Sequence, residues 1–85
     1  MIELLDFWAP WCGQCKAFAP TVEAVVEKLG VKITKVDVEK DLTLASQYSI
    51  MNLPTVVILQ DGKEVCRVTG LVSEQILLDK VKEFM

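Results

Sequence analysis

The hydrophobic and polar positions along the chain follow two periods, one typical of strands and one typical of helices. Residues 2–7 are mostly apolar and predict a buried strand, whereas residues 31–38 alternate and predict a strand with one exposed face. A β-branched run at 56–59 predicts a third strand. An Asp-Gly turn signal then leads into a fourth strand at 63–69.

A long helical pattern starts at or just after Cys12 and ends at Gly30, a residue type common at helix C-termini. Apolar residues recur every three or four positions in it, which predicts one buried face. Pro20 lies inside this pattern and is expected to kink the helix. The residues predicted to be buried are Phe18, Val22, Val25, Val26 and Leu29.

Two shorter helices are predicted downstream. Residues 42–48 follow Asp41 and residues 74–84 follow Ser73, and both preceding residues are good N-caps. The order βαβαββα predicts a single α/β domain over residues 1–85, with a right-handed first crossover and helices on both faces of a four-stranded mixed sheet. In the last helix, the residues expected to face inward are Ile76, Leu77, Val81 and Phe84.

Composition narrows the class of protein. With 85 residues, of which 52% are hydrophobic and 25% charged, the chain fits one globular domain. No apolar run approaches the roughly 20 residues that span a bilayer, so no membrane partner is expected. The net charge of −3 argues against nucleic acid as a partner. The first six residues contain acids and no basic region, so we expect no secretory signal and a cytoplasmic location.

The candidate chemistry is that of thiols. The chain has no histidine, which excludes Ser-His-Asp and Cys-His catalysis and a histidine-ligated zinc site. Three cysteines, Cys12, Cys15 and Cys66, do not form an even-numbered disulfide framework. Two of them lie three residues apart, at the spacing of a redox pair or of half a metal site.

The predicted strand–turn–helix order places Cys12 where a helix begins. Unpaired amide groups and the helix dipole favour a thiolate there. Cys15 lies one turn later, close enough to attack a mixed disulfide formed at Cys12. A zinc site within one chain would need two further ligands, and only Cys66 is left, so we expect no metal or other cofactor. A metal shared between two subunits, or a pair of buried structural cysteines, are the alternatives on these residues alone.

The segment from Asp6 to Lys16, with the sequence DFWAPWCGQCK, resembles the active-site segment of thioredoxins. The resemblance extends over nearly the whole chain and implies a thioredoxin-like fold with strand order 2-1-3-4. Relative to that family, the sequence starts at the central strand, without the usual first strand and helix. Further matches are Pro20, the Leu53-Pro54-Thr55 loop, Lys35 and Gly70.

The resemblance implies roles for these residues. Cys12 would be the nucleophile and Cys15 the resolving thiol. Asp6 would lie buried behind them, with its pKa raised by burial, and relay a proton to or from Cys15, while Lys35 would tune it. Pro54 would be cis.

A substrate-binding surface is also implied. The backbone of Leu53, presented by the proline loop, would bind an extended substrate segment. Trp11, which we expect to be more exposed than Trp8, would help to form this surface. The other residues assigned to it are Gly13, Gln14, Pro54 and Gly70.

Gln14 replaces the proline that thioredoxins usually carry between the two cysteines. It restores an amide proton that can donate toward the Cys12 sulfur. We expect this to favour the thiolate and to make the pair more oxidising by some tens of millivolts. At the sheet edge, residues 31–38 carry Lys32 and Lys35, which discourage edge pairing, and the chain is expected to be a monomer.

The leading functional prediction is a protein-disulfide reductase, an electron carrier of cell redox homeostasis that a flavin- or ferredoxin-linked thioredoxin reductase recharges. A glutathione-dependent glutaredoxin is the first alternative, but Thr69 to Ser73 lacks that family's Gly-Gly pair followed by an acidic residue. The others are a non-catalytic metal-binding or interaction module and, because of Gln14, a net oxidant or isomerase. Cys66 is expected to be a half-buried hydrophobic residue, with a regulatory or dimer-forming thiol as its alternative.

Overall fold

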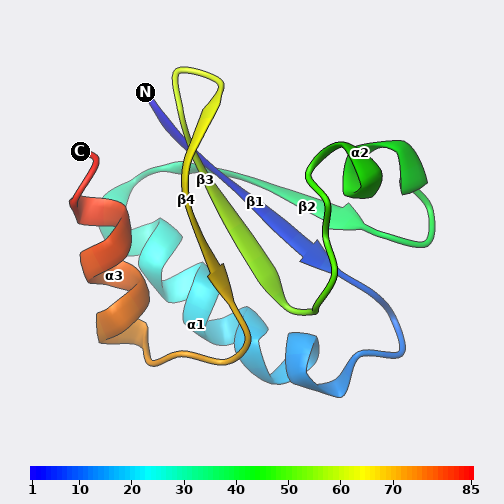
Figure 1. Cartoon of the computed structure of the whole chain (residues 1–85). Helices are drawn as coiled ribbons and strands as arrows, with labels where there is room; N and C mark the ends of the chain where they lie inside the picture. Colours follow the sequence, from blue (N-terminus) through cyan, green and yellow to red (C-terminus); the bar gives the residue numbers. More distant parts are fainter.

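The computed structural model describes residues 1–85 and contains one mixed sheet between two layers of helices (Figure 1). The strands are β1 (Ile2–Trp8), β2 (Lys32–Asp37), β3 (Thr55–Gln60) and β4 (Lys63–Thr69). Their order in the sheet is β2-β1-β3-β4, as predicted. β1 runs parallel to β2 and antiparallel to β3, and β3 and β4 form an antiparallel hairpin.

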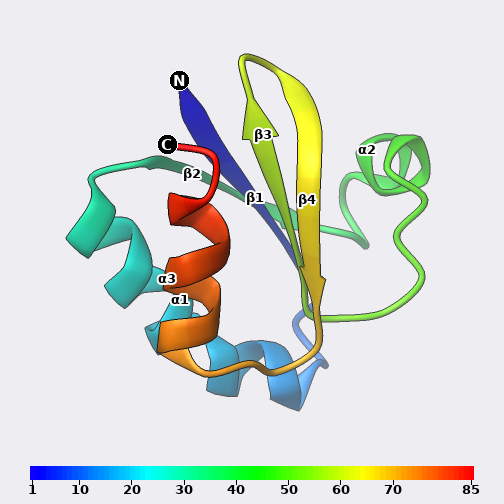
Figure 2. The ribbon, with the colours of Figure 1, turned by 60° about the vertical axis from the view of Figure 1, so that its left-hand side comes forward.

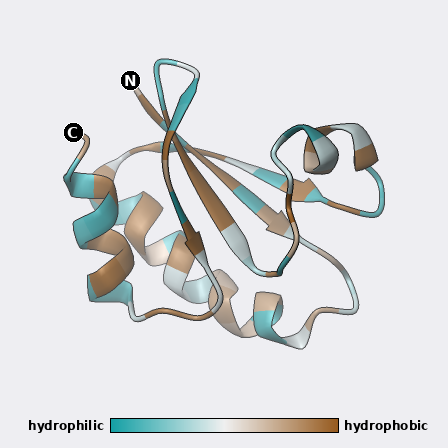
Figure 3. Ribbon diagram, in the orientation of Figure 1, coloured by the Kyte–Doolittle hydropathy of each residue, from teal (hydrophilic) through white to brown (hydrophobic).

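The helices lie on both faces of this sheet, as predicted. α1 (Gly13–Leu29) and α3 (Glu74–Lys82) cover one face, and the short α2 (Leu42–Gln47) lies on the other (Figure 2). Because side chains alternate along a strand, Leu4 of β1 packs toward α1 and α3, whereas Leu5 and Phe7 face the opposite layer. The two central strands, β1 and β3, are the most hydrophobic elements of the sheet (Figure 3).

Helix α1 has the predicted buried face, since Phe18, Val22 and Val25 are buried. Val26 and Leu29 pack against the same core but are only partly buried. The helix ends at Gly30, which adopts a left-handed conformation with φ of 64° and donates its N–H to the Val26 carbonyl at 2.8 Å. None of the three helices is both long enough and apolar enough to cross a membrane.

The expectation for the last helix is partly wrong. Leu77 and Val81, four residues apart, are fully buried, but Ile76 is 50% exposed. One residue corresponds to about 100° of rotation, which turns Ile76 away from the face that Leu77 occupies. The helix also ends at Lys82, so Phe84 packs against the core from beyond the helix rather than from within it.

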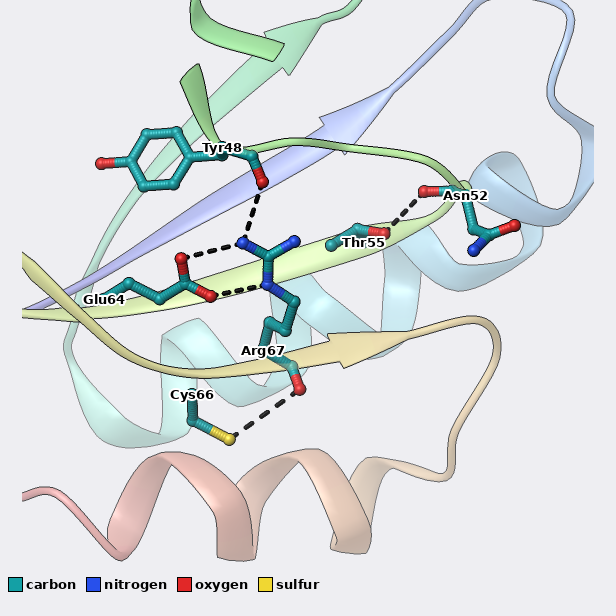
Figure 4. A network of polar contacts seen from close by, with 6 residues as sticks. All are labelled: Tyr48, Asn52, Thr55, Glu64, Cys66 and Arg67. Atoms are coloured by element: carbon teal, nitrogen blue, oxygen red, sulfur yellow. Dashed lines mark hydrogen bonds and ion pairs between the residues drawn. The ribbon is translucent and has the colours of Figure 1, made fainter. Parts of the chain in front are cut away.

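A polar network fixes the segment between α2 and β3 (Figure 4). Arg67 of β4 forms two hydrogen bonds with the carboxylate of Glu64, at 2.6 and 2.8 Å, and also donates to the Tyr48 carbonyl at 2.9 Å. At the other end of the segment, the Thr55 hydroxyl donates to the Asn52 carbonyl at 2.6 Å. Both ends of this loop are therefore tied to the sheet.

Replacing Arg67 with Met is expected to lower the free energy of unfolding at neutral pH by about 1 kcal/mol. The hydrogen bonds from Arg67 hold the pKa of the Glu64 carboxyl below its ordinary value. The stabilisation that the Arg67–Glu64 pair contributes is present at neutral pH and is lost as the pH falls through the pKa of Glu64 in the folded protein. Urea unfolding at neutral and acidic pH measures it, with Lys80→Met as a control. An equal loss at every pH would contradict the assignment.

Candidate active site

The two cysteines of the motif lie where β1 gives way to α1. Cys12 is the N-cap of α1 in an extended conformation, and its N–H donates to the Ala9 carbonyl at 3.1 Å. The N–H of Cys15 donates to the Cys12 sulfur, also at 3.1 Å. A disulfide joins the two residues, whose Cα atoms are 5.3 Å apart. The first turn of the helix thus directs one of its unpaired amides, that of Cys15, at the Cys12 sulfur.

The two cysteines are not distinguished by their exposure. Cys12 is 7% exposed and Cys15 is 8% exposed. They differ in the cavity that each one lines. Cys12 opens onto a broad groove, whereas Cys15 lines a smaller cavity that it shares with Asp6. In the disulfide form, a molecule that approaches Cys12 therefore does so through the groove.

The groove has a volume of about 530 Å³ and is mainly apolar. Four of the predicted substrate-binding residues line it, namely Trp11, Gly13, Gln14 and Leu53. Trp11 is 68% exposed, whereas Trp8 is partly covered, as predicted. Sequence reasoning missed the remaining lining residues, of which Met51, 88% exposed, is an apolar side chain that projects from the loop. These residues are Val38, Ala45, Ile50, Met51 and Asn52.

The peptide bond between Leu53 and Pro54 is cis, as predicted. Pro54 is buried, and its carbonyl accepts a hydrogen bond of 2.8 Å from the N–H of Gly70. Gly70 has a φ of 82°, a conformation that side chains rarely adopt. It does not line the groove itself but lies directly behind the proline loop. The structure therefore connects the two predicted residues through the backbone.

A hydrogen bond that sequence reasoning missed holds Trp11 at the edge of the groove. The indole N–H donates to the carboxylate of Glu39 at 2.6 Å. Glu39 follows β2, and its own N–H donates to the Asp37 carboxylate at 2.9 Å. Nothing in the sequence marks an acidic residue in this turn, because its partner lies 28 positions away.

Asp6 is buried behind the cysteines, as the resemblance implied. It is 6% exposed, in the central strand, between Lys35 of β2 and Val56 of β3. Burial raises the pKa of its carboxyl, the positive charge of Lys35 lowers it, and the negative charge of Glu23 raises it. The carboxyl lines a cavity of about 180 Å³ whose other residues are Trp8, Cys15, Lys16, Ala19 and Lys35.

Two further expectations depend on local contacts. In the disulfide form, the amide that donates to the Cys12 sulfur belongs to Cys15 and not to Gln14. The contribution of Gln14 to the reduced protein stays a prediction.

Cys66 is half-buried and packs against the core formed with α1 and α3, on the side of β4 opposite Arg67 (Figure 4). Its packing is that of a small hydrophobic residue.

Substituting Asn for Asp6 is expected to stabilise the protein at neutral pH by about 1–3 kcal/mol, because it removes a buried charge. Burial raises the pKa of Asp6 in the folded protein. The contribution of Asp6 to stability is therefore most favourable below its pKa in the unfolded chain and is lost as the pH rises through its pKa in the folded state.

Urea unfolding of the disulfide form across acidic to neutral pH measures this difference. The advantage of Asp6→Asn should disappear at low pH, and Glu83→Gln, a change at an exposed acid, should have little effect throughout. A less stable Asp6→Asn protein at neutral pH would mean that the buried carboxylate is better accommodated than its surroundings indicate.

Comparisons with known proteins agree with this geometry. The thioredoxin family model matches residues 2–83. The chain is 37% identical to a thioredoxin of Bacillus subtilis, over 99% of this chain and 83% of that protein, and 43% identical to thioredoxin 1 of Synechococcus elongatus, over 91% and 77%.

Solved structures give the same result. A mutant thioredoxin from Halobacterium salinarum matches with a TM-score of 0.92 and 37% identity, over 98% of this chain and 74% of that one. The thioredoxin of Fasciola hepatica matches with a TM-score of 0.89 and 38% identity, over 99% and 81%. With its Cys-x-x-Cys pair at disulfide distance, the chain belongs to the thioredoxin family and is a thiol–disulfide oxidoreductase.

Proposed function

We propose that the chain reduces protein disulfides, with Cys12 as the nucleophile and Cys15 as the resolving thiol. The observation that carries this assignment is the position of Cys12 at the N-cap of α1, where its sulfur accepts the Cys15 N–H and faces the groove. A thiolate at this position is stabilised by the amide and by the helix dipole. Cys15, inside the first turn, faces the cavity of Asp6 instead.

The reaction takes two exchange steps. The Cys12 thiolate attacks one sulfur of the substrate disulfide, forms a mixed disulfide and releases the other substrate sulfur as a thiolate, which takes a proton from water. Cys15 then loses its proton and attacks the Cys12 sulfur, which breaks the bond to the substrate. The substrate gains two electrons, and the protein ends with the Cys12–Cys15 disulfide.

Asp6 is the proposed proton acceptor for Cys15 in the second step. Both residues line the same small cavity, which also gives a route for the proton to solvent. The raised pKa of the Asp6 carboxyl makes its ionised form a stronger base than an ordinary aspartate. Lys35, at the rim of this cavity, is the proposed modulator of that basicity.

The groove is the proposed substrate site. Its apolar lining and the exposed Trp11 and Met51 suit an extended segment with hydrophobic residues next to its cysteine. Leu53 lines this groove directly before the cis bond, where its backbone would pair with the segment. Gly13 and Gln14 also line the groove, and the N–H of Gly70 donates to the Pro54 carbonyl and so supports the proline loop.

The proposed partners are disulfide-containing proteins and a flavin- or ferredoxin-linked thioredoxin reductase, in the cytoplasm. A reducing compartment suits the unpaired thiol of Cys66. Such a carrier would serve electron transport to disulfide substrates. The groove favours a protein segment over a glutathione-specific site, because Thr69 to Ser73 lacks an acidic residue to hold glutathione.

Insulin disulfide reduction with a thioredoxin reductase and NADPH tests this function. Cys12→Ser is expected to abolish turnover, because it removes the nucleophile. Cys15→Ser should also stop turnover but accumulate a mixed disulfide with the substrate, visible by non-reducing electrophoresis and mass spectrometry. Cys66→Ser is the matched control and should retain activity within about twofold, since a half-buried thiol outside the site takes no part.

The outcomes separate the alternatives. Turnover with glutathione but not with a thioredoxin reductase would assign the chain to glutaredoxin-like chemistry. Loss of activity in Cys66→Ser, or a mixed disulfide trapped on Cys15 rather than Cys12, would contradict the assigned roles.

Replacing Gln14 with Pro is expected to lower the reduction potential of the Cys12–Cys15 pair by some tens of millivolts. Gln14 is the second residue of α1, where an amide has no partner within the helix, so in the reduced protein it adds a donor near the thiolate. Equilibration with glutathione buffers measures the potential, and Gln14→Ala, which keeps the amide, is the control. An unchanged or higher potential in Gln14→Pro would overturn this account.

A further inference from the structure

An ion pair links α1 to the edge strand beside the buried carboxyl. The ammonium group of Lys35 lies 3.3 Å from a carboxylate oxygen of Glu23. Glu23 is on the exposed side of α1, two turns after Cys15, and 63% of its side chain is exposed. Lys35 is the direct neighbour of Asp6 in the pairing of β1 with β2. Lys35 thus has two acidic neighbours, Asp6 and Glu23, and forms its ion pair with the more exposed one, Glu23.

The choice between these two acids matters for proton transfer. An ammonium group close to a carboxylate favours its ionised form and makes it a weaker base. In the structure, Lys35 pairs with Glu23 and forms no ion pair with Asp6. Lys35 also lines the cavity that holds Asp6 and Cys15. The orientation of the Lys35 ammonium group therefore determines how much positive charge lies beside the cavity of Asp6 and Cys15.

We propose that Glu23 is a positioning residue for the resolving step, which it assists by holding the Lys35 ammonium group away from Asp6. The inference rests on the proposed role of Asp6 as the base for Cys15. In that step, the Cys15 proton moves to an Asp6 carboxylate oxygen, the Cys15 and Cys12 sulfurs form a bond, and the substrate sulfur leaves as a thiolate. Asp6 then returns the proton to solvent through the cavity.

The charges around Asp6 agree with this role. α1 contributes Lys16 and Glu23 to its surroundings, β2 contributes Lys35, and β3 contributes only the uncharged Val56. The negative charge of Glu23 raises the pKa of the Asp6 carboxyl, whereas the positive charge of Lys35 lowers this pKa. Loss of Glu23 therefore lowers the pKa of Asp6 in two ways. It removes a negative charge near the carboxyl, and it frees the Lys35 ammonium group to approach that carboxyl.

Stopped-flow reaction of the reduced protein with dithiobis(nitrobenzoate), in a Cys66→Ala background, separates the two steps. The first release of thionitrobenzoate reports attack by Cys12, and the second reports resolution by Cys15. In Glu23→Gln we expect the acid limb of the second phase to move to lower pH and its plateau rate to fall by up to about fivefold, the scale of one exposed ion pair. The first phase should keep its pH profile.

Three comparisons make the test specific. Lys35→Gln should move the acid limb the opposite way, to higher pH, because it removes the positive charge. Glu27→Gln, which removes an exposed acid one turn further along α1, should leave it unchanged. High salt should shrink the effect of Glu23→Gln, since it screens exposed charges. A carboxyl-carbon NMR titration of Asp6 should move in the same directions.

The inference is overturned if Glu23→Gln leaves the second phase unchanged, shifts it to higher pH, or shifts it no more than Glu27→Gln does. Those results differ from a failure of the proposed function itself. If the proposed function itself failed, the unsubstituted protein would show no second phase, and no Cys12–Cys15 disulfide would form in any variant.

Discussion

The start of α1 at Cys12 is the constraint on which the rest of the site depends. A helix leaves its first amides without partners, and here one of them, from Cys15, meets the Cys12 sulfur. The helix can begin at this point because the central strand β1 ends at Trp8 and a short turn leads from there to the N-cap of α1. The cysteines thereby lie between a central strand of the sheet and the longest helix of the fold.

This placement divides the surroundings of the motif into two chemically different spaces. The groove in front of Cys12 is broad and apolar and suits a protein segment. The cavity behind Cys15 is smaller and is lined by Asp6, Lys16 and Lys35. One helical turn therefore separates a sulfur that opens onto the groove from a sulfur that lines the cavity of Asp6. The two cysteines are about equally covered, so the roles proposed for them rest on the neighbours of each and not on exposure.

Periodicity predicted the strands and helices because burial sets the pattern of apolar positions. The central strands β1 and β3 are mostly buried on both faces and give apolar runs, whereas the edge strand β2 has exposed polar positions. It failed at Ile76, where apolar residues are adjacent along α3 and only one of them can face the core. The cis bond at Pro54 came from the resemblance alone, since an X–Pro pair carries no local signal for its isomer.

The site contacts that sequence reasoning missed share one property. The hydrogen bonds of Trp11 with Glu39 and of Lys35 with Glu23 join polar groups of exposed side chains across 28 and 12 positions. Exposed polar residues have no required partner, so their sequence pattern does not say which pairs form. The fold decides this by bringing the β2 edge beside α1. Burial in the central strand is the largest cause of the raised pKa of the Asp6 carboxyl, and the exposed charges of Lys35 and Glu23 shift that pKa in opposite directions. An exposed ion pair can form or break without repacking the core, so it is the part of this environment that can adjust the basicity of Asp6.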